Sequence, residues 1–148
     1  MGNAKYDALK IENQLCFPLY AASREIIKQY KPFLDELDLT YTQYITMLVL
    51  WEYGEMSVKD LGQRLLLDSG TLTPLLKKLE AKGLLTRRRC TNDERCLLVK
   101  LTDVGTAMKD RAVSIPERMA ACCHLEPTEA AELYRILYKI LAGVTVED

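Results

Sequence analysis

The fold is decided by residues 57–101, which read SVKDLGQRLLLDSGTLTPLLKKLEAKGLLTRRRCTNDERCLLVKL. Within this stretch, apolar residues recur at spacings of three and four in two short segments. This spacing predicts two amphipathic helices, separated by a polar break at residues 68–70. Two further apolar runs, 84–90 and 96–101, flank a charged turn at residues 91–95, which predicts a β-hairpin. Together these patterns predict a winged helix-turn-helix.

The first helix of the pair is predicted to begin after Ser57, because Asp60 lies three residues later, as in a capping box. Its apolar positions are Val58, Leu61, Leu65 and Leu66. The second helix buries a similar stripe, made of Leu72, Leu75, Leu76 and Leu79. Gly83 suits the left-handed position that closes a helix.

The outward face of the second helix carries hydroxyl and amine groups, which can donate hydrogen bonds to phosphates and base edges. The helix N-terminus adds a partial positive charge. We therefore predict a DNA interface that includes Ser69, Gly70, Thr71, Thr73, Lys77 and Lys78. Pro74 leaves the start of this helix open. A start at Asp68 costs one internal hydrogen bond, whereas a start at Thr73 puts proline at its favoured first position.

The turn of the hairpin carries both signs of charge, and an arginine at such a tip can enter a narrow minor groove. Arg95 is predicted to do so, with Asp93 fixing its direction through a charge-assisted hydrogen bond. Arg87, on the preceding strand, is assigned to the same DNA surface. The alternatives are that the positive run is only a solvated face, or that the winged helix docks another protein.

Charge location favours DNA. Residues 57–100 hold ten Lys or Arg against five Asp or Glu, a local charge of +5, so the other residues carry −6 to give the formal total of −1. This distribution is typical of a specific DNA-binding protein rather than a generally adhesive one.

The length of 148 residues and the 49% hydrophobic content predict a single domain, residues 1–148. No apolar run reaches the ~20 residues that span a bilayer, and the N-terminal residues lack the apolar region of a signal peptide, so we expect a cytoplasmic protein without membrane contact. The five cysteines are then expected to be separate thiols rather than a disulfide framework.

A helical pattern runs from Leu9 to Tyr30, and Pro18 indicates that a regular helix begins, or a longer one kinks, near residues 16–18. Cys16 would lie at this helix N-terminus, where thiolate is favoured over thiol. Pro32 is predicted to end the segment. A capping box at residues 40–43 then predicts a helix from Tyr41 to Tyr53, closed by Gly54.

After the hairpin, Thr102 is predicted to cap a helix through Ile115, with a kink at Pro116. The final residues carry a clear apolar stripe with little beside it in sequence to cover it. We therefore expect the first and last helices to form a homodimer, which also supplies the twofold pair of helices that a palindromic operator requires. The predicted fold is mainly α with a β-hairpin wing: a winged-helix lobe at about 40–101 and dimerisation helices at about 8–32 and 103–148.

Three segments resemble the MarR family of winged-helix repressors, and within it the type that senses organic hydroperoxides. They are LDSGTLTPLLKKLE, the wing sequence DER at residues 93–95, and NQLCFPLYAASREIIKQYKPFL followed by LTYTQY. The resemblance implies a dimeric repressor whose N-terminal cysteine, here Cys16, is oxidised by organic hydroperoxide, so that DNA is released. It also implies that Tyr30 and Tyr41 hydrogen-bond the reactive sulfur across the dimer, with Tyr20 one helical turn beyond Cys16. Pro18 departs from the family pattern.

The remaining cysteines have several readings. The resemblance to the two-cysteine branch implies that Cys122 or Cys123 of the opposite subunit resolves the oxidised Cys16, and the sequence favours Cys122 weakly. Both could instead be buried helix-end residues. Cys90 and Cys96 are interpreted as small strand residues, although they flank a turn that they could cross-link. The spacing of Cys122, Cys123 and His124 is unlike that of a zinc site, so no metal and no cofactor are expected.

Two alternatives to a peroxide-sensing repressor remain open. One is a repressor that a phenolic or electrophilic ligand releases from DNA, with Cys16 incidental or merely a small buried residue. The other is a thiol peroxidase that uses Cys16, although no CxxC motif supports turnover.

Overall fold

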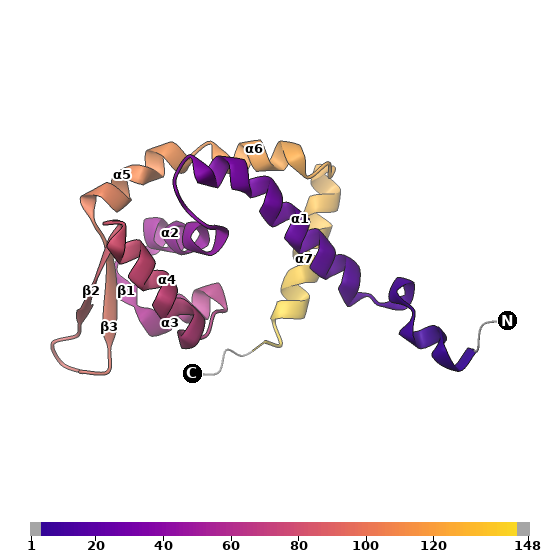
Figure 1. Ribbon diagram of the computed structural model, residues 1–148, viewed down its shortest axis with the longest axis horizontal. Helices are drawn as coiled ribbons and strands as arrows, with labels where there is room; N and C mark the ends of the chain where they lie inside the picture. The colour runs from indigo at the N-terminus through magenta and orange to yellow at the C-terminus, as the bar shows by residue number, and fades with distance from the viewer. Residues whose placement is uncertain (1–3, 145–148) are drawn as a thin grey trace.

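The structure is a computed structural model that describes residues 4–144, and the winged helix-turn-helix forms its left-hand lobe in Figure 1. The lobe contains α2 (Tyr41–Tyr53), β1 (Met56–Ser57), α3 (Val58–Leu65), α4 (Ser69–Ala81), β2 (Leu85–Arg89) and β3 (Leu97–Leu101). The other helices are α1 (Cys16–Asp35), α5 (Asp103–Ala112), α6 (Ile115–Cys122) and α7 (Pro127–Leu141). Two 3-10 turns, Ala4–Leu9 and Ile11–Asn13, precede α1. The predicted fold class is confirmed.

Side-chain caps begin the helices of the lobe at the predicted residues. The Thr40 hydroxyl accepts from the Gln43 backbone N–H at 3.3 Å while the Gln43 side chain accepts from the Thr40 N–H at 3.0 Å, which completes the capping box of α2. Ser57 caps α3 by accepting from the Asp60 N–H at 3.0 Å. Asp68 caps α4 by accepting from the Thr71 N–H at 2.8 Å. Each cap satisfies a backbone donor that the first helical turn leaves without a partner.

The cap at Asp68 decides between the two possible starts of α4. The helix begins at Ser69, and Pro74 lies inside it. The missing proline N–H leaves the Gly70 carbonyl without its helical partner, at a position exposed to water. Burial of the leucine stripe offsets this loss, since Leu72, Leu76 and Leu79 are at most 1% exposed.

A third strand that the sequence did not predict completes the sheet. The strand order is β1-β3-β2, with β1 antiparallel to β3 through the pairs Met56↔Val99 and Ser57↔Leu98. β1 therefore joins the start of α3 to the wing. Because the same residue, Ser57, ends β1 and caps α3, the wing and the helix-turn-helix are held in one unit.

Three predicted boundaries were wrong. Pro32 does not end the first segment, because α1 continues to Asp35, where the burial of Leu34 offsets the single missing backbone bond. The helix predicted through Ile115 divides instead at residues 113–114, and Pro116 occupies the first turn of α6, where it costs no bond. Leu66 lies beyond α3 in the left-handed conformation, with φ of 54°, and is exposed.

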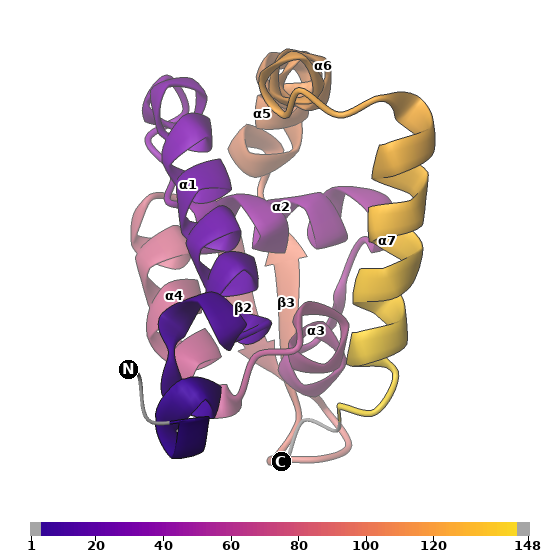
Figure 2. The same ribbon diagram turned by 90° about the vertical axis from the view of Figure 1, so that its right-hand side faces the viewer.

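Helices α1 and α7 leave the lobe and are mostly uncovered. Figure 2 shows α7 standing apart from α1, and no residue of α7 is buried. Only Leu34 is buried in α1. The exposed apolar side chains of the two helices include Phe17, Leu19, Ile26, Ile27, Leu133, Ile136, Ile140 and Leu141. Such a surface is larger than a lone chain ordinarily leaves in water. Within residues 4–144, no helix has the length and apolar character to cross a membrane.

Candidate functional site

The outward face of α4 presents the residues that the sequence assigned to DNA. Ser69, Gly70, Thr71, Lys77 and Lys78 are exposed, while Thr73 is half-buried. The Thr71 hydroxyl lies 3.3 Å from the Asp68 carboxylate, so one cap orients both the backbone and a side chain of the first turn. The start of the helix is thus ordered and open to an anionic partner.

Arg87 has a different setting from these residues. Its backbone N–H and its guanidinium Nη2 both donate to the Glu80 carboxylate at 3.0 Å, and its side chain is 17% exposed. The pairing with Arg87 lowers the pKa of Glu80. This contact joins β2 to the C-terminal end of α4, so Arg87 is placed to hold the wing against α4.

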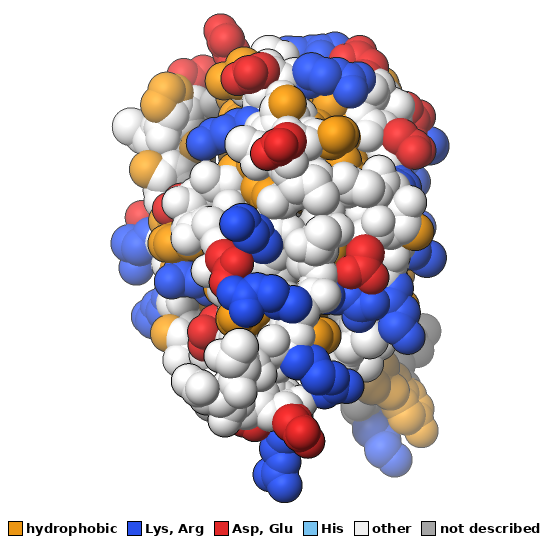
Figure 3. Space-filling view, turned by 90° about the vertical axis from the view of Figure 1, so that its left-hand side faces the viewer, with side chains coloured by type: hydrophobic (Ala, Val, Ile, Leu, Met, Phe, Trp, Pro, Cys, Tyr) orange, Lys and Arg blue, Asp and Glu red, His pale blue; other side chains and the backbone are white. Residues whose placement is uncertain are grey.

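The wing loop carries Asp93 and Arg95 at its exposed tip. The Asp93 carboxylate accepts from the backbone N–H of Arg95 at 2.9 Å, rather than from its guanidinium as expected. The Arg89 guanidinium donates to the Glu94 carbonyl at 2.5 Å across the turn. These bonds shape the loop and leave the Arg95 side chain free to extend. Figure 3 shows this side of the molecule, where Lys and Arg spread over the middle and lower part with fewer acidic side chains among them.

Cys90 and Cys96 are joined by a disulfide across the base of this loop, with a Cα–Cα distance of 5.3 Å. The preferred interpretation of two separate strand thiols was therefore wrong. The hairpin register is the physical reason, because pairing of Arg89 with Leu97 puts the next residues, Cys90 and Cys96, opposite each other.

Three tyrosines gather where α1 and α2 cross. The ring centroids of Tyr30 and Tyr41 are 5.0 Å apart, and Tyr44 lies 5.7 Å from Tyr30 and 6.4 Å from Tyr41. Burial, followed by its neighbours Tyr41, Tyr44 and Cys123, raises the pKa of Tyr30 to about 12. Tyr30 is therefore a neutral hydrogen-bond donor at physiological pH. The sequence named two of these residues and missed Tyr44, although its spacing from Tyr41 on α2 placed both on one face.

Cys16 lies far from this cluster in its own chain. It is the first residue of α1 and is exposed, so it is not a small core residue. Fourteen positions of α-helix separate it from Tyr30, which corresponds to about 21 Å along the axis. The helix begins at Cys16, and Pro18 sits in its first turn, where the missing N–H costs nothing. Tyr20, one turn on, is also exposed and lies beneath Arg24, 5.2 Å from the ring centroid. One subunit alone therefore does not bring Cys16 and the tyrosines together.

Cys122 and Cys123 differ in their surroundings. The Cys122 thiol contacts the Arg118 carbonyl of its own helix at 3.3 Å and is half-buried. Cys123 is exposed and contributes to the raised pKa of Tyr30, so it lies within electrostatic range of the tyrosine cluster. These surroundings favour Cys123 over Cys122 as the thiol available to a partner at the tyrosines.

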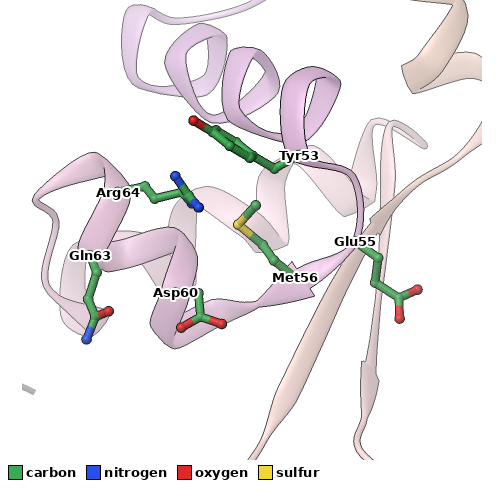
Figure 4. A pocket seen from close by; sticks show the side chains of 6 residues that line it. All are labelled: Tyr53, Glu55, Met56, Asp60, Gln63 and Arg64. Atoms are coloured by element: carbon green, nitrogen blue, oxygen red, sulfur yellow. The ribbon is translucent and has the colours of Figure 1, made fainter.

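A hollow of about 470 Å³ opens between α2, β1 and α3. Figure 4 shows Arg64 and Met56 directed toward Tyr53, with the Arg64 guanidinium 3.7 Å from the ring centroid, whereas Glu55 points away. Glu55 instead accepts from Arg88 of β2 at 2.7 Å. The contact of Arg64 with Tyr53 joins α3 to α2, and the ion pair of Glu55 with Arg88 joins the start of β1 to the wing, which indicates a structural role for this region. Among residues 4–144 no cluster of His, Cys, Asp or Glu could hold a metal ion.

The fold and the exposed α4 and wing define a winged-helix transcriptional regulator, and the comparisons give its family. The family profile "Transcriptional regulator SarA/Rot" matches residues 28–112. The organic hydroperoxide resistance transcriptional regulator of Bacillus subtilis (strain 168) is 49% identical over 137 residues, 93% of each chain. The chain belongs to the MarR/SarA family of winged-helix regulators, and within it to the OhrR type.

Solved structures of one relative agree with this assignment. AbfR, reduced and bound to DNA, is 34% identical with a TM-score of 0.78, and the match covers 92% of this chain and 93% of that one. Disulfide-formed AbfR is 35% identical with a TM-score of 0.64, and the match covers 95% of this chain and 99% of that one. AbfR comes from Staphylococcus epidermidis.

Proposed function

We propose that this protein is a DNA-binding transcriptional repressor that senses organic hydroperoxides by oxidation of Cys16 and then releases its operator. The observation that carries the proposal is the position of Cys16: exposed at the start of α1, among apolar side chains that its own chain does not cover. A thiol in that position can react with an apolar organic hydroperoxide once a second subunit packs against α1. The similarity to a regulator named for organic hydroperoxide resistance supports the same reading.

The dimer completes the sensor. Packing of α1 and α7 against a second copy buries their apolar faces and brings Cys16 of one subunit to the Tyr30 and Tyr41 phenols of the other. A neutral phenol can stabilise the thiolate by donating a hydrogen bond without forming an ion pair. Tyr44 packs behind both rings and fixes their positions.

The chemistry takes one equivalent of peroxide. The Cys16 sulfur, as thiolate, attacks the hydroperoxide, the O–O bond breaks, and the proton lost from the thiol goes to the leaving alkoxide, so the products are a Cys16 sulfenic acid and the alcohol. The Cys123 thiol of the partner subunit then attacks that sulfur, and its proton leaves with the hydroxyl as water, which gives an intersubunit disulfide. If the Cα atoms start more than ~7 Å apart, the dimer helices must move to form this bond and carry the recognition helices out of register. Oxidation is thus a single switching event in the cytoplasm rather than enzymatic turnover.

On DNA, the exposed face of α4 contacts bases and phosphates in the major groove, and Arg95 of the wing reaches the minor groove. Two such units in the dimer read a pseudopalindromic operator. Arg87, paired with Glu80, positions β2 and the wing rather than touching DNA itself.

The test of the sensor compares Cys16→Ser with the wild type. Both proteins should bind a promoter duplex in a mobility-shift assay, but only the wild type should leave it after one equivalent of cumene hydroperoxide. Serine keeps the shape of the residue and cannot be oxidised. Release of Cys16→Ser at the wild-type dose would refute the proposal, as would release of the wild type by a phenolate with Cys16 unmodified. Continued peroxide consumption in the presence of a thiol reductant would indicate a peroxidase.

The resolving step has a matched pair of variants. Cys123→Ser should abolish the covalent dimer seen on non-reducing electrophoresis after peroxide, whereas Cys122→Ser should leave it intact. The opposite result would restore the assignment to Cys122. An oxidised wild type that stays monomeric on the gel, with a small-thiol adduct on Cys16, would place the protein in the one-cysteine branch.

A further inference from the structure

The wing of this protein carries two cysteines for which the sensor described above has no use. Cys90 and Cys96 directly follow and precede the paired strand residues, and the Cys90 N–H donates to the Cys96 carbonyl at 2.9 Å. Their Cα atoms, 5.3 Å apart, lie within the range that a disulfide spans. The hairpin backbone therefore holds the two cysteines at a separation that a disulfide can span.

The surroundings of the pair favour thiol chemistry. Arg89 and Arg95 adjoin the two cysteines in sequence, and the Arg89 guanidinium donates to the Glu94 carbonyl across the same turn, so positive charge lies on the loop that the pair closes, which favours a thiolate. Asp93 and Glu94 act in the opposite sense, but the Asp93 carboxylate already accepts the Arg95 N–H. Residues 91–95 are all exposed, so a small oxidant or thiol can reach the base of the loop.

The same loop faces the helix-turn-helix across a cavity of about 700 Å³. Asp93, Arg95 and Cys96 line it from the wing side, and Asp68 and Ser69, at the start of α4, line it from the other. The shape of the loop thus sets where Arg95 stands relative to the first turn of the recognition helix. A covalent bond at the loop base restricts that position to a narrow range.

We propose that Cys90 and Cys96 are a second redox site, which an organic hydroperoxide closes to a disulfide and a small thiol reopens, and that the closed wing binds the operator more tightly. The inference rests on the proposed function in one respect, that the wing contacts DNA. In the closing step one thiolate attacks the hydroperoxide, giving a sulfenic acid and the alcohol. The second thiol displaces water from that sulfur, so two thiols and one peroxide give one disulfide, one alcohol and one water.

The expected gain in affinity follows from preorganisation. In the open form the loop that carries Arg95 must be ordered when DNA binds, whereas in the closed form the disulfide restricts the loop before binding. Ordering of one such group at an interface corresponds to about a 2- to 10-fold change in affinity. Closing the wing disulfide should raise the affinity for DNA, whereas oxidation of Cys16 should lower it. The effect of the wing must therefore be measured in a variant that lacks Cys16.

The experiment uses two full-length variants. The first, Cys16→Ser/Cys122→Ser/Cys123→Ser, keeps only the wing pair. The second adds Cys90→Ser and Cys96→Ser and serves as the matched control. Each is treated with excess thiol or with cumene hydroperoxide, freed of reagent, and titrated by fluorescence anisotropy with a duplex selected from a random pool by the reduced wild type. Peptide mapping without reduction reports the Cys90–Cys96 bond directly.

We expect the first variant to form the wing disulfide and to bind the duplex about 2- to 10-fold more tightly when oxidised, while the control shows no change. Thiols that remain open to alkylation after peroxide would overturn the inference. So would equal affinities in the two redox states, or an equal shift in the control. Failure of the proposed function would look different, because the reduced wild type would then select no duplex, and the mapping would still decide whether the pair is redox-active.

Discussion

Replacement of Asp68 should distinguish two effects of its carboxylate: its role as the cap of α4, and its negative charge. The Asp68 carboxylate accepts from the Thr71 N–H at 2.8 Å and lies 3.3 Å from the Thr71 hydroxyl. Asp68→Ala removes both contacts, whereas Asp68→Asn keeps an acceptor and loses only the negative charge. Aspartate and asparagine are about equally good at this position of a helix, and alanine is much worse.

Loss of such a cap costs about 1 kcal/mol, within a range of roughly 0.5–2 kcal/mol. The first turn of α4 contains Ser69, Gly70 and Thr71, which are all assigned to the DNA interface. Fraying of this turn should therefore lower the affinity for DNA. If the whole cost appears in binding, operator affinity falls about fivefold, since 1.4 kcal/mol corresponds to a factor of ten. In Asp68→Asn the affinity should stay equal to that of the wild type or rise, because one negative charge near the phosphates is gone.

Urea unfolding at one fixed protein concentration gives the stability difference, and fluorescence anisotropy with an operator duplex gives the affinity. We expect Asp68→Ala to be less stable by about 1 kcal/mol and Asp68→Asn to lie within about 0.5 kcal/mol of the wild type. Equal destabilisation of both variants would refute the reasoning, since the charge would then matter more than the cap. Because both variants lose the same charge, equal DNA affinity of Asp68→Ala and Asp68→Asn would show that the first turn of α4 does not contact DNA.

Three further predictions concern the interface, the tyrosine cluster and the core. Lys77→Ala should weaken binding to all duplexes and reduce the slope of log affinity against log salt by about one, whereas Arg95→Ala should mainly reduce discrimination between sequences. Because burial raises the folded-state pKa of Tyr30 to about 12, above the ordinary value near 10, Tyr30 contributes stability below pH ~10 that is lost as the pH rises toward 12. Tyr30→Phe should flatten the alkaline fall in stability, measured by urea unfolding at several pH values; an unchanged profile would contradict this. Leu79→Ala, at a fully buried position, should cost about 2–5 kcal/mol in urea unfolding, and exposed Lys78→Ala less than about 0.5 kcal/mol.

Much of the winged helix could be predicted because its signals are local. The Thr40–Gln43 capping box, the Ser57 cap and the glycine at 83, where φ is 75°, each act within a few residues and are confirmed. The strand Met56–Ser57 was missed because two residues show no periodicity. The prediction that Pro32 ends the helix was wrong because the helix continues as far as the buried Leu34, and that packing is visible only in the structure.

The residues of the candidate site also fall into two groups, those that local sequence patterns indicate and those that only tertiary structure brings together. The exposed face of α4 follows from helical periodicity, so its residues could be named in advance. The ion pair of Arg87 with Glu80 depends on how a strand packs against a helix, and no sequence spacing indicates it. The preference for Cys123 over Cys122 likewise depends on tertiary structure, since Cys123 contributes to the raised pKa of Tyr30 and is exposed, whereas Cys122 is half-buried against its own helix. The Cys90–Cys96 bond depends on the hairpin register, because the pairing of Arg89 with Leu97 places Cys90 opposite Cys96.

The separation of Cys16 from Tyr30 along a single helix has a genetic consequence. If each sensing centre takes its sulfur from one chain and its phenols from the other, two defective alleles can complement each other. A mixed dimer of Cys16→Ser and Tyr30→Phe chains would contain one centre with both substitutions and one with neither. It would respond to peroxide at the wild-type rate in half of its centres, although each homodimer is impaired in both. A centre built within one chain would give no such rescue, so co-expression of the two alleles would reveal how the sensor is shared between subunits.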